Sequence, residues 1–338
     1  IYVMGLRSAA PLAQFMYHYL HQILDEVVLV QNTTGDVFEE IARIGEQSFR
    51  AKQLWQWIYY RGETDFTNMT NLSKDLRAKL ADNFTITRPK IVAEQISKDK
   101  THKWLLEFAD GQRIETVYIP EEDRGAVCIS TQVGCAVGCK FCHPGSQKIT
   151  RNLTAGEIVS QFMVARDAYG EWPSPTNETR FLSNIVVMGM GEPLHNPDNV
   201  FKALKILSDG DGIAISKRKI TLSTSGIAPK IGLVASELGC KLAISLHAPN
   251  NEKRSQIMPI NERYPIEEVL KGCQEYQRQM SPGRYITFEY LMLKDFNDSP
   301  EDAKALIALM KKHKFKIVRS VRIKIDHNLL SKPGTKLS

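Results

Sequence analysis

Hydrophobic spacing divides the chain into a helical beginning and a longer mixed part. Apolar residues between Ala51 and Ile58 recur every three to four positions, which predicts an amphipathic helix that ends near Gly62. A second helix is predicted over residues 73–83, where two leucines lie on one face. We therefore expect a small helical accessory domain over residues 1–90.

Residues 91–120 alternate between apolar and polar side chains, with turn sequences at Asp99-Lys100 and Asp110-Gly111, and we expect them to form a strand-rich connector. Strands and helices alternate in the remaining domain, residues 121–338. Strands are expected at 126–131, 184–189, 219–224, 241–246, 286–292 and 315–325, and helices at 154–170, 197–208, 227–238, 265–280 and 299–313. This order predicts βαβ units and a parallel sheet. The fold class is thus α/β, an incomplete (β/α)6 barrel whose active residues lie at the carboxyl ends of its strands.

Charge is distributed unevenly along the chain. The formal net charge is +6, but Lys311 to Ser338 holds nine Lys and Arg residues against one acid, an excess of +8, so the rest sums to −2. Net charge alone therefore does not identify a nucleic-acid-binding protein. The apolar region at residues 9–30 is interrupted by two histidines and two acids. We expect no membrane span and a cytoplasmic location.

The six cysteines are distributed as in metal or redox proteins rather than as in a disulfide framework. Three of them form the motif Cys135-Ala-Val-Gly-Cys139-Lys-Phe-Cys142. Three thiolates leave one iron of a [4Fe–4S] cluster open, whereas a closed zinc site requires four ligands. Cys128, in the preceding strand, would be the fourth ligand in a zinc alternative. Phe141 is expected to shield a cluster from water.

Polar residues end the next three predicted strands. Met188-Gly-Met-Gly-Glu192-Pro193 ends the second strand, Leu222-Ser-Thr-Ser-Gly226 the third, and Ser245-Leu-His247 the fourth. Glycines permit close approach of the backbone, and the Glu192 carboxylate accepts hydrogen bonds from an amine. Each feature alone is common at a strand end, but three in succession at the same edge of the barrel indicate one binding site.

These motifs, in this order, resemble those of the RlmN family of radical-SAM RNA methyltransferases, which act on adenine C2. The related Cfr type acts on C8. The resemblance runs from about Arg50 to Phe315. It includes the blocks Ile114-Glu-Thr-Val-Tyr-Ile-Pro120, Gln132-Val-Gly-Cys135, Arg151-Asn-Leu-Thr154, Ser216-Lys-Arg-Lys219 and Ser245-Leu-His-Ala-Pro249.

The resemblance implies a mechanism with two molecules of S-adenosylmethionine (SAM). One methylates a cysteine near the C-terminus. The other, bound to the open iron of a [4Fe–4S] cluster, is cleaved to a 5′-deoxyadenosyl radical that activates this methyl-cysteine for addition to adenine. Implied substrates are 23S rRNA and tRNA. The implied enzyme is a monomer that receives electrons from a donor such as flavodoxin.

Family roles carry over to individual positions. The implied cluster ligands are Cys135, Cys139 and Cys142; the implied SAM contacts are Gly191, Glu192, Ser223, Ser245, Leu246 and His247; the implied proton acceptor is Glu115, and the cysteine that resolves the RNA–protein adduct is Cys128. Without the resemblance, Cys128 is better explained as a buried strand cysteine, and Glu115 as the partner of a lysine. The candidates for RNA phosphate contacts are Arg50, Lys52, Lys74 and Arg77. Nearby acidic residues almost balance their charge, so a solvated surface of mixed charge is an equally good interpretation.

The sequence departs from the family after about residue 315. It lacks the Asn-Leu-Ile-Pro segment whose Asn contacts SAM, and no cysteine follows Cys273, so the methyl-carrying cysteine is missing. We expect one of three explanations: a frameshifted reading frame, a truncated reading frame, or a family member that carries the methyl group on a different residue. Three functions stay open: an RlmN-type methyltransferase, an inactive cluster- and RNA-binding protein, and a Cfr-like C8 methyltransferase.

Overall fold

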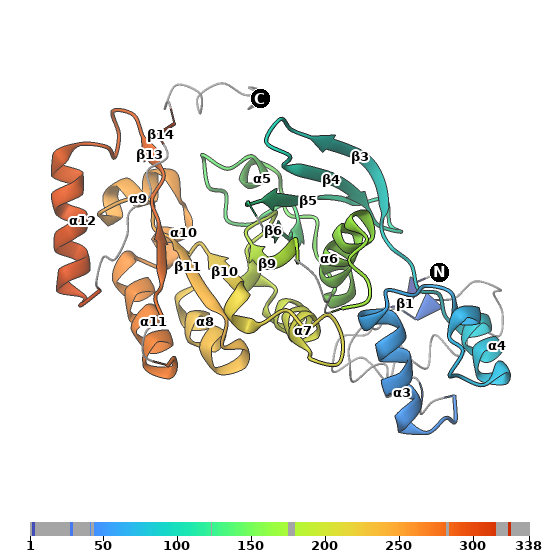
Figure 1. Ribbon diagram of the computed structural model, residues 1–338. Coiled ribbons are helices and arrows are strands. Elements are labelled where there is room, and N and C mark those ends of the chain that lie inside the picture. Colours follow the sequence, from blue (N-terminus) through green and yellow to red (C-terminus); the bar gives the residue numbers. More distant parts are fainter. Residues whose placement is uncertain are drawn as a thin grey trace.

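The structure, a computed structural model, describes residues 2–3, 28–29, 41, 44–122, 124–174, 180–281, 284–315 and 324–325. An eight-stranded sheet, with the order β12-β11-β10-β9-β6-β5-β4-β3, runs through the molecule (Figure 1). Its strands are β3 (Lys90–Ile96), β4 (His102–Glu107), β5 (Arg113–Pro120), β6 (Gly125–Cys128), β9 (Leu182–Val187), β10 (Ile220–Thr224), β11 (Lys241–Ser245) and β12 (Thr287–Glu289). Three pairs of short strands complete the set: β1 (Tyr2–Val3) with β2 (Val28–Leu29), β7 (Gln132–Val133) with β8 (Arg151–Asn152), and β13 (Met292–Leu293) with β14 (Lys324–Ile325).

Helices follow the parallel strands in chain order. The α-helices are α3 (Ser48–Trp55), α4 (Lys74–Asn83), α5 (His143–Ser146), α6 (Ala155–Tyr169), α7 (Pro197–Ser208), α8 (Ala228–Leu233), α9 (Asn251–Ile257), α10 (Ile260–Arg263), α11 (Ile266–Gln279) and α12 (Pro300–Lys312). Short turns of other helical types are η1 (Gln56–Tyr60), η2 (Phe66–Asn68), η3 (Pro193–His195), η4 (Lys217–Lys219) and η5 (Val234–Leu238). In Figure 1, α6, α7, α8 and α11 lie along one side of the sheet, with α3 and α4 far from α12.

Local sequence signals explain the helix boundaries. The Thr154 hydroxyl accepts the N–H of Glu157, whose carboxylate accepts the N–H of Thr154 in return, so α6 begins with a reciprocal cap. It ends at Gly170, which adopts φ +63°. The two predicted N-terminal helices are confirmed as α3 and α4, and the five helices predicted after residue 150 are confirmed as α6, α7, α8 with η5, α11 and α12.

Five parallel strands form the half of the sheet next to the site. β6, β9, β10, β11 and β12 pair parallel in that spatial order and confirm five of the six strands predicted for the barrel. The sixth, at 315–325, falls largely outside the described residues; Lys324–Ile325 pairs parallel with β13. No helix within the described ranges is long and apolar enough to cross a membrane.

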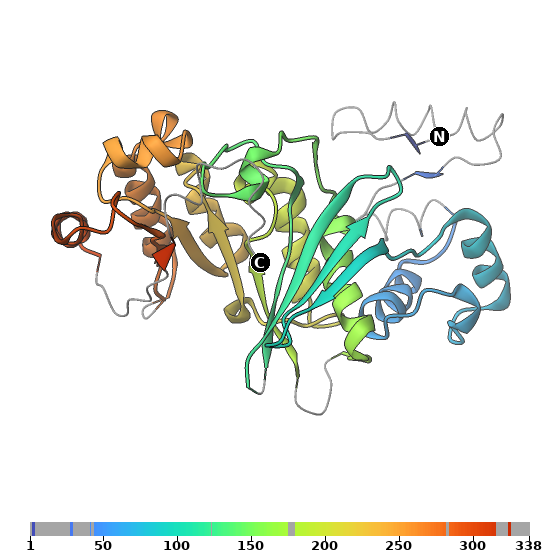
Figure 2. The ribbon, with the colours of Figure 1, turned by 90° about the horizontal axis from the view of Figure 1, so that it is seen from above.

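The segment predicted as a connector is part of the same sheet. β3, β4 and β5 pair antiparallel with one another, and β5 pairs antiparallel with β6. Figure 2 shows them as a ribbon between the N-terminal helices and the parallel strands. The N-terminal helices bury an apolar core of their own, made of Ile41, Ile44, Ala51, Leu54, Phe66, Met69, Leu72, Leu76 and Leu80. The larger core lies between the main sheet and its helices.

Candidate active site

A short hairpin closes the loop that carries the three motif cysteines. β7 and β8 pair antiparallel and enclose residues 134–150, named here the cysteine loop. Gly134 opens it with φ +77°. A β-carbon at this position would lie 2.3 Å from the carbonyl oxygen of Lys148, so only glycine fits there.

The three thiols lie close enough to influence one another. Cys135, Cys139 and Cys142 are all half-buried. Burial raises the pKa of each thiol, and that of Cys139 reaches about 12 because the thiols of Cys142 and Cys135 and the carboxylate of Glu192 add to the effect of burial. Metal ligation requires thiolates, and three thiolates beside a carboxylate repel one another unless a cationic group lies among them.

These donors fit a cluster better than a zinc ion. A closed zinc site brings four ligands to a single ion, whereas each thiolate of a [4Fe–4S] cluster binds its own iron. Three separate thiols around a cationic iron–sulfur core therefore match the chemistry of this loop.

One side of the cysteine loop rests on an apolar wall. Cys139 and Phe141 pack against Ile257, Met258 and Leu293. The rings of Phe141 and His247 meet edge to face, with their centroids 4.8 Å apart. This packing supports the expectation that Phe141 keeps water from its cysteine neighbours.

Glu192 lies in the turn after β9 and joins three parts of the site. The residue is 3% exposed. Its carboxylate accepts hydrogen bonds from the N–H of Leu194 (2.9 Å), the Thr224 hydroxyl (2.8 Å), and both the N–H (2.7 Å) and the hydroxyl (2.6 Å) of Ser225. Its N–H donates to the side-chain oxygen of Gln132 at 2.9 Å. The Glu192 carboxylate thus links the ends of β9 and β10.

Gly191 allows the turn to pack against the cysteine loop. Its φ is +99°, and a β-carbon added at Gly191 would lie 2.6 Å from the β-carbon of Gln132. The Gln132 amide nitrogen donates to the side-chain oxygen of Asn152 at 2.7 Å. One buried glutamine therefore connects both strands of the hairpin to the Gly191–Glu192 turn.

A second carboxylate collects the serines of the next two strands. The hydroxyls of Ser223, on β10, and Ser245, on β11, donate to the same oxygen of Glu289 at 3.0 and 3.1 Å. Glu289 ends β12, and its carbonyl oxygen accepts the N–H groups of Leu246 (3.0 Å) and His247 (3.1 Å). The polar ends of the third and fourth predicted strands therefore meet at Glu289, an acid that the sequence analysis did not select.

His247 is buried and held in an unusual backbone conformation. It adopts φ +56°, and its carbonyl accepts the side-chain amide of Asn297 at 2.7 Å. Burial lowers the pKa of the imidazole to about 3, and the Arg254 guanidinium contributes to this. Since Nδ1 accepts the N–H of Leu291 at 3.0 Å, the proton of the neutral ring resides on Nε2.

Glu115 and Cys128 share one face of the sheet. Val117 lies opposite Cys128 across the β5–β6 pair, and Glu115 is two residues from Val117, so the three side chains point to the same side. The Glu115 carboxylate, 46% exposed, pairs with Lys103 at 3.1 Å. Burial raises the pKa of Cys128 to about 11. A hollow of about 500 Å³, lined partly by Lys103 and Val117, opens on this face.

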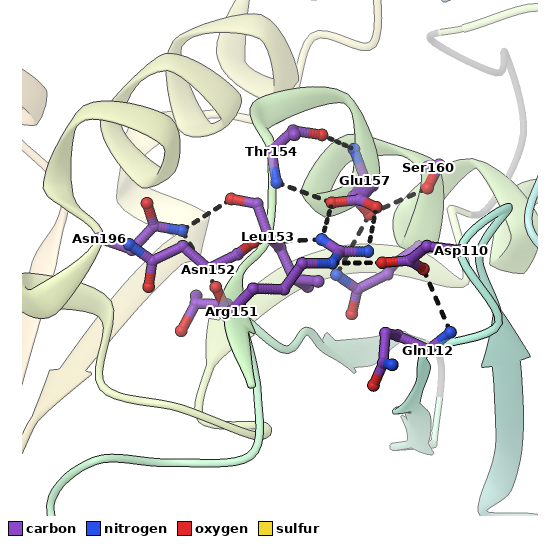
Figure 3. A network of polar contacts seen from close by, with 11 residues as sticks. Asp110, Gln112, Arg151, Asn152, Leu153, Thr154, Glu157, Ser160 and Asn196 are labelled. Carbon is purple, nitrogen blue, oxygen red and sulfur yellow. Dashed lines mark hydrogen bonds and ion pairs between the residues drawn. The ribbon is translucent and has the colours of Figure 1, made fainter. Parts of the chain in front are cut away.

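Arg151 anchors the base of the cysteine loop (Figure 3). Its guanidinium makes two hydrogen bonds of 2.8 Å to the Glu157 carboxylate, and its Nε donates to Asp110 at 2.6 Å. Beside it, the Asn196 amide donates to the carbonyl oxygens of Thr131 (3.0 Å) and Leu153 (2.8 Å). The loop is thereby fixed to α6, to the β4–β5 turn and to the segment after β9.

The sequence analysis did not select two residues of the site, Glu289 and Arg254. Glu289 is the last residue of the fifth parallel strand, so the rule that selected the ends of the second to fourth strands could have found it. Arg254 is fully buried behind the strand ends. Its position in the sequence, within a polar stretch before Met258, carries no comparable signal.

Two family models match the sequence. The Ribosomal RNA large subunit methyltransferase N-terminal domain matches residues 33–86, and the Radical SAM superfamily matches residues 129–309. The second match covers more than half of the chain and contains the cysteine loop and the carboxyl ends of β9, β10, β11 and β12.

Curated relatives extend this similarity. A "Dual-specificity RNA methyltransferase RlmN" of Rhodospirillum rubrum is 60% identical over 283 residues, which are 82% of this chain and 66% of that protein. A protein of the same description from Gluconobacter oxydans is 57% identical over 280 residues, 81% of this chain and 69% of its own. The chain thus spans about two thirds of the length of these relatives. The crystal structure of a radical SAM methyltransferase from Sphaerobacter thermophilus superimposes with a TM-score of 0.76 at 42% identity, covering 85% of this chain and 82% of that one.

Proposed function

The chain belongs to the RlmN family of the radical SAM superfamily, and we propose from this that it methylates C2 of adenosine in 23S rRNA and some tRNAs by a radical mechanism. The observation that carries the proposal is the convergence of two groups. The hairpin that encloses the three motif cysteines is joined to the turn after β9, because the N–H of Glu192 donates to the side-chain oxygen of Gln132 at 2.9 Å. A cluster and the SAM amine would meet at this point.

Cys135, Cys139 and Cys142 would hold a [4Fe–4S] cluster with one iron open. The bound cluster would supply the electron that cleaves SAM. Phe141 and the apolar residues beneath it would exclude water from one side, which protects a radical from side reactions.

The strand ends would bind and orient SAM. Glu192 already accepts four hydrogen bonds, about as many as a carboxylate can take. An amine would therefore bind when the Thr224 or Ser225 hydroxyl turns away. Gly191 would bring the backbone close to the ligand, and Ser223, Ser245, Leu246 and His247 would line the rest of the site.

Glu115 and Cys128 would act on the substrate side. Glu115 and Cys128 are diagonal neighbours on one face of the sheet, a relation in which two residues lie roughly 7–8 Å apart. A proton acceptor at Glu115 must first separate from Lys103. Cys128, with a pKa near 11, is a thiol at neutral pH and would react as a nucleophile only after losing its proton.

The N-terminal domain, residues 1–90, would contact RNA phosphates. Arg50 donates to Gln53 and to the carbonyl of Asn71. Lys52 and Lys74 are exposed. They are therefore better placed than Arg50 to bind phosphate without breaking an internal contact. The proposed partners also include an electron donor of the flavodoxin class, and we expect a cytoplasmic monomer.

A methylation assay tests the proposal. The anaerobically reconstituted chain is incubated with dithionite, SAM with a deuterated methyl group, and either a 23S rRNA fragment or tRNA, and the digested nucleosides are identified by mass spectrometry. The proposal expects labelled 2-methyladenosine. Label at C8 would indicate a Cfr-like enzyme, and bound iron without SAM cleavage an inactive binding protein.

Matched cysteine variants serve as controls. Cys142→Ser should abolish SAM cleavage, because Cys142 lies in the cysteine loop. Cys240→Ser should retain it, because Cys240 is buried directly before β11, outside that loop. The six cysteines do not include one after Cys273, so the assay also reports whether this sequence completes methyl transfer.

A further inference from the structure

Arg254, on α9, is a fully buried cation behind the strand ends. Its guanidinium donates to the carbonyl oxygens of Leu246 (3.1 Å), Ser225 (2.6 Å) and Ser245 (3.0 Å) and to the side-chain oxygen of Asn261 (2.9 Å). Through these contacts it ties the ends of β10 and β11 to α9.

All four acceptors are neutral. Within the described part of the chain, no carboxylate forms an ion pair or hydrogen bond with Arg254. Burying a charge without an opposite charge is costly, and apolar side chains of similar volume often serve a purely structural role better. The hydrogen bonds of Arg254 are therefore satisfied, while its charge is not compensated by any of these acceptors.

The anionic candidates near this charge are thiols. Burial lowers the pKa of Arg254 to about 10, while the thiols of Cys139 and Cys273 act in the opposite direction. The cysteine loop is also joined to the same helix, since the N–H of Lys140 donates to the carbonyl of Ile257 at 2.9 Å. The residue after Cys139 is thus hydrogen-bonded to the last residue of α9, the helix that carries Arg254.

We propose that Arg254 is the buried counter-charge of the iron–sulfur cluster and raises the cluster's reduction potential. The inference rests on the proposed function, since it requires that the cysteine loop hold a [4Fe–4S] cluster. A cluster with three thiolate ligands is anionic when oxidised, and one electron from an external reductant makes it more negative without changing any bond. A fixed cation therefore stabilises the reduced form more than the oxidised form.

The test is a redox titration of the reconstituted cluster, followed by electron paramagnetic resonance without SAM or RNA. Arg254→Gln removes the charge, and Arg254→Lys keeps it. At a fixed potential, we expect Arg254→Gln to lower the ratio of reduced to oxidised cluster about tenfold, equivalent to about 59 mV for one electron. Arg254→Lys should stay within about threefold of the unaltered chain. The matched control, Arg166→Met, removes another fully buried arginine, on α6, and should leave the ratio unchanged.

A structural role would give a different pattern. If Arg254→Lys lowers the ratio as much as Arg254→Gln, or if Arg254→Gln holds its iron with an unchanged ratio, the proposal is wrong. Should Arg254→Gln fail to fold, Cys273→Asp decides the question. Cys273 interacts electrostatically with Arg254, and its side chain makes none of the four hydrogen bonds of Arg254. A carboxylate at this position should offset the guanidinium charge and lower the ratio, so an unchanged ratio overturns the proposal. Absence of iron from the unaltered chain would count against the proposed function instead.

Discussion

Replacing Arg151 by methionine tests how the cysteine loop is anchored. The substitution keeps much of the aliphatic stem but removes four hydrogen bonds of the guanidinium, two to Glu157, one to Asp110 and one to the carbonyl oxygen of Asn152. It leaves α6 otherwise intact, because the reciprocal contact between Thr154 and Glu157 does not involve Arg151.

The magnitude follows from the exposure of the partners. The side chains of Arg151, Glu157 and Asp110 are 25%, 20% and 42% exposed. Exposed ion pairs contribute at most about 1 kcal/mol, whereas breaking a buried pair costs about 3–5 kcal/mol. A bidentate pair between these limits should contribute about 2–3 kcal/mol. For a chain of 338 residues that corresponds to a fall in Tm of about 3–4 °C.

The assay is urea and thermal unfolding of the metal-free protein, together with iron content after reconstitution. Arg113→Met is the matched control, because Arg113 is 57% exposed and pairs with Glu107 at 2.7 Å; it should cost less than about 1 kcal/mol. Arg151→Met should also lower iron incorporation. A loss of stability no larger than that of Arg113→Met, with normal iron content, would refute the anchoring role.

Two further predictions concern other contacts. Burial alone would raise the pKa of Asp302, but the Lys253 ammonium, 2.6 Å away, and other hydrogen bonds lower it overall. Its stabilisation is therefore present above the unfolded pKa of about 3.9 and is lost as pH falls through the folded value. Asp302→Asn should cost about 1–3 kcal/mol at pH 7 and less at pH 3, and an equal cost at both pH values in urea unfolding would contradict this. Gly191→Ala should weaken SAM binding at least tenfold, measured by calorimetry, because a β-carbon at this position would overlap Gln132. The control variant Gly210→Ala should bind SAM normally, because the space around Gly210 is open. Equal SAM affinities of the two variants would contradict this prediction.

Helices and central strands were predictable because their signals are local. Thr154, Glu157 and Gly170 mark the ends of α6 in the sequence itself. Buried parallel strands correspond to short apolar runs in the sequence, and the polar residues that follow these runs identify the edge of the sheet where the site lies. Cys135 and Glu192 could thus be assigned to one site before their positions were known.

Contacts between distant segments were not predictable in the same way. The predicted boundary between residues 120 and 121 does not separate two units, because β5 and β6 on either side of it pair antiparallel and the N–H of Glu121 donates to the carbonyl of Arg124. The convergence of two serines on Glu289 depends on the register of β10, β11 and β12, which sequence order does not specify. The departure from the family pattern after residue 315 falls almost entirely outside the described residues.

The most direct test of the central claim is Mössbauer spectroscopy of the anaerobically reconstituted chain, before and after SAM is added. If Cys135, Cys139 and Cys142 hold a cluster with one open iron, the protein should contain about four irons per chain. The spectrum of one iron should then change when SAM binds. A zinc ion held by four thiolates including Cys128, or an iron spectrum that SAM leaves unchanged, would contradict the account.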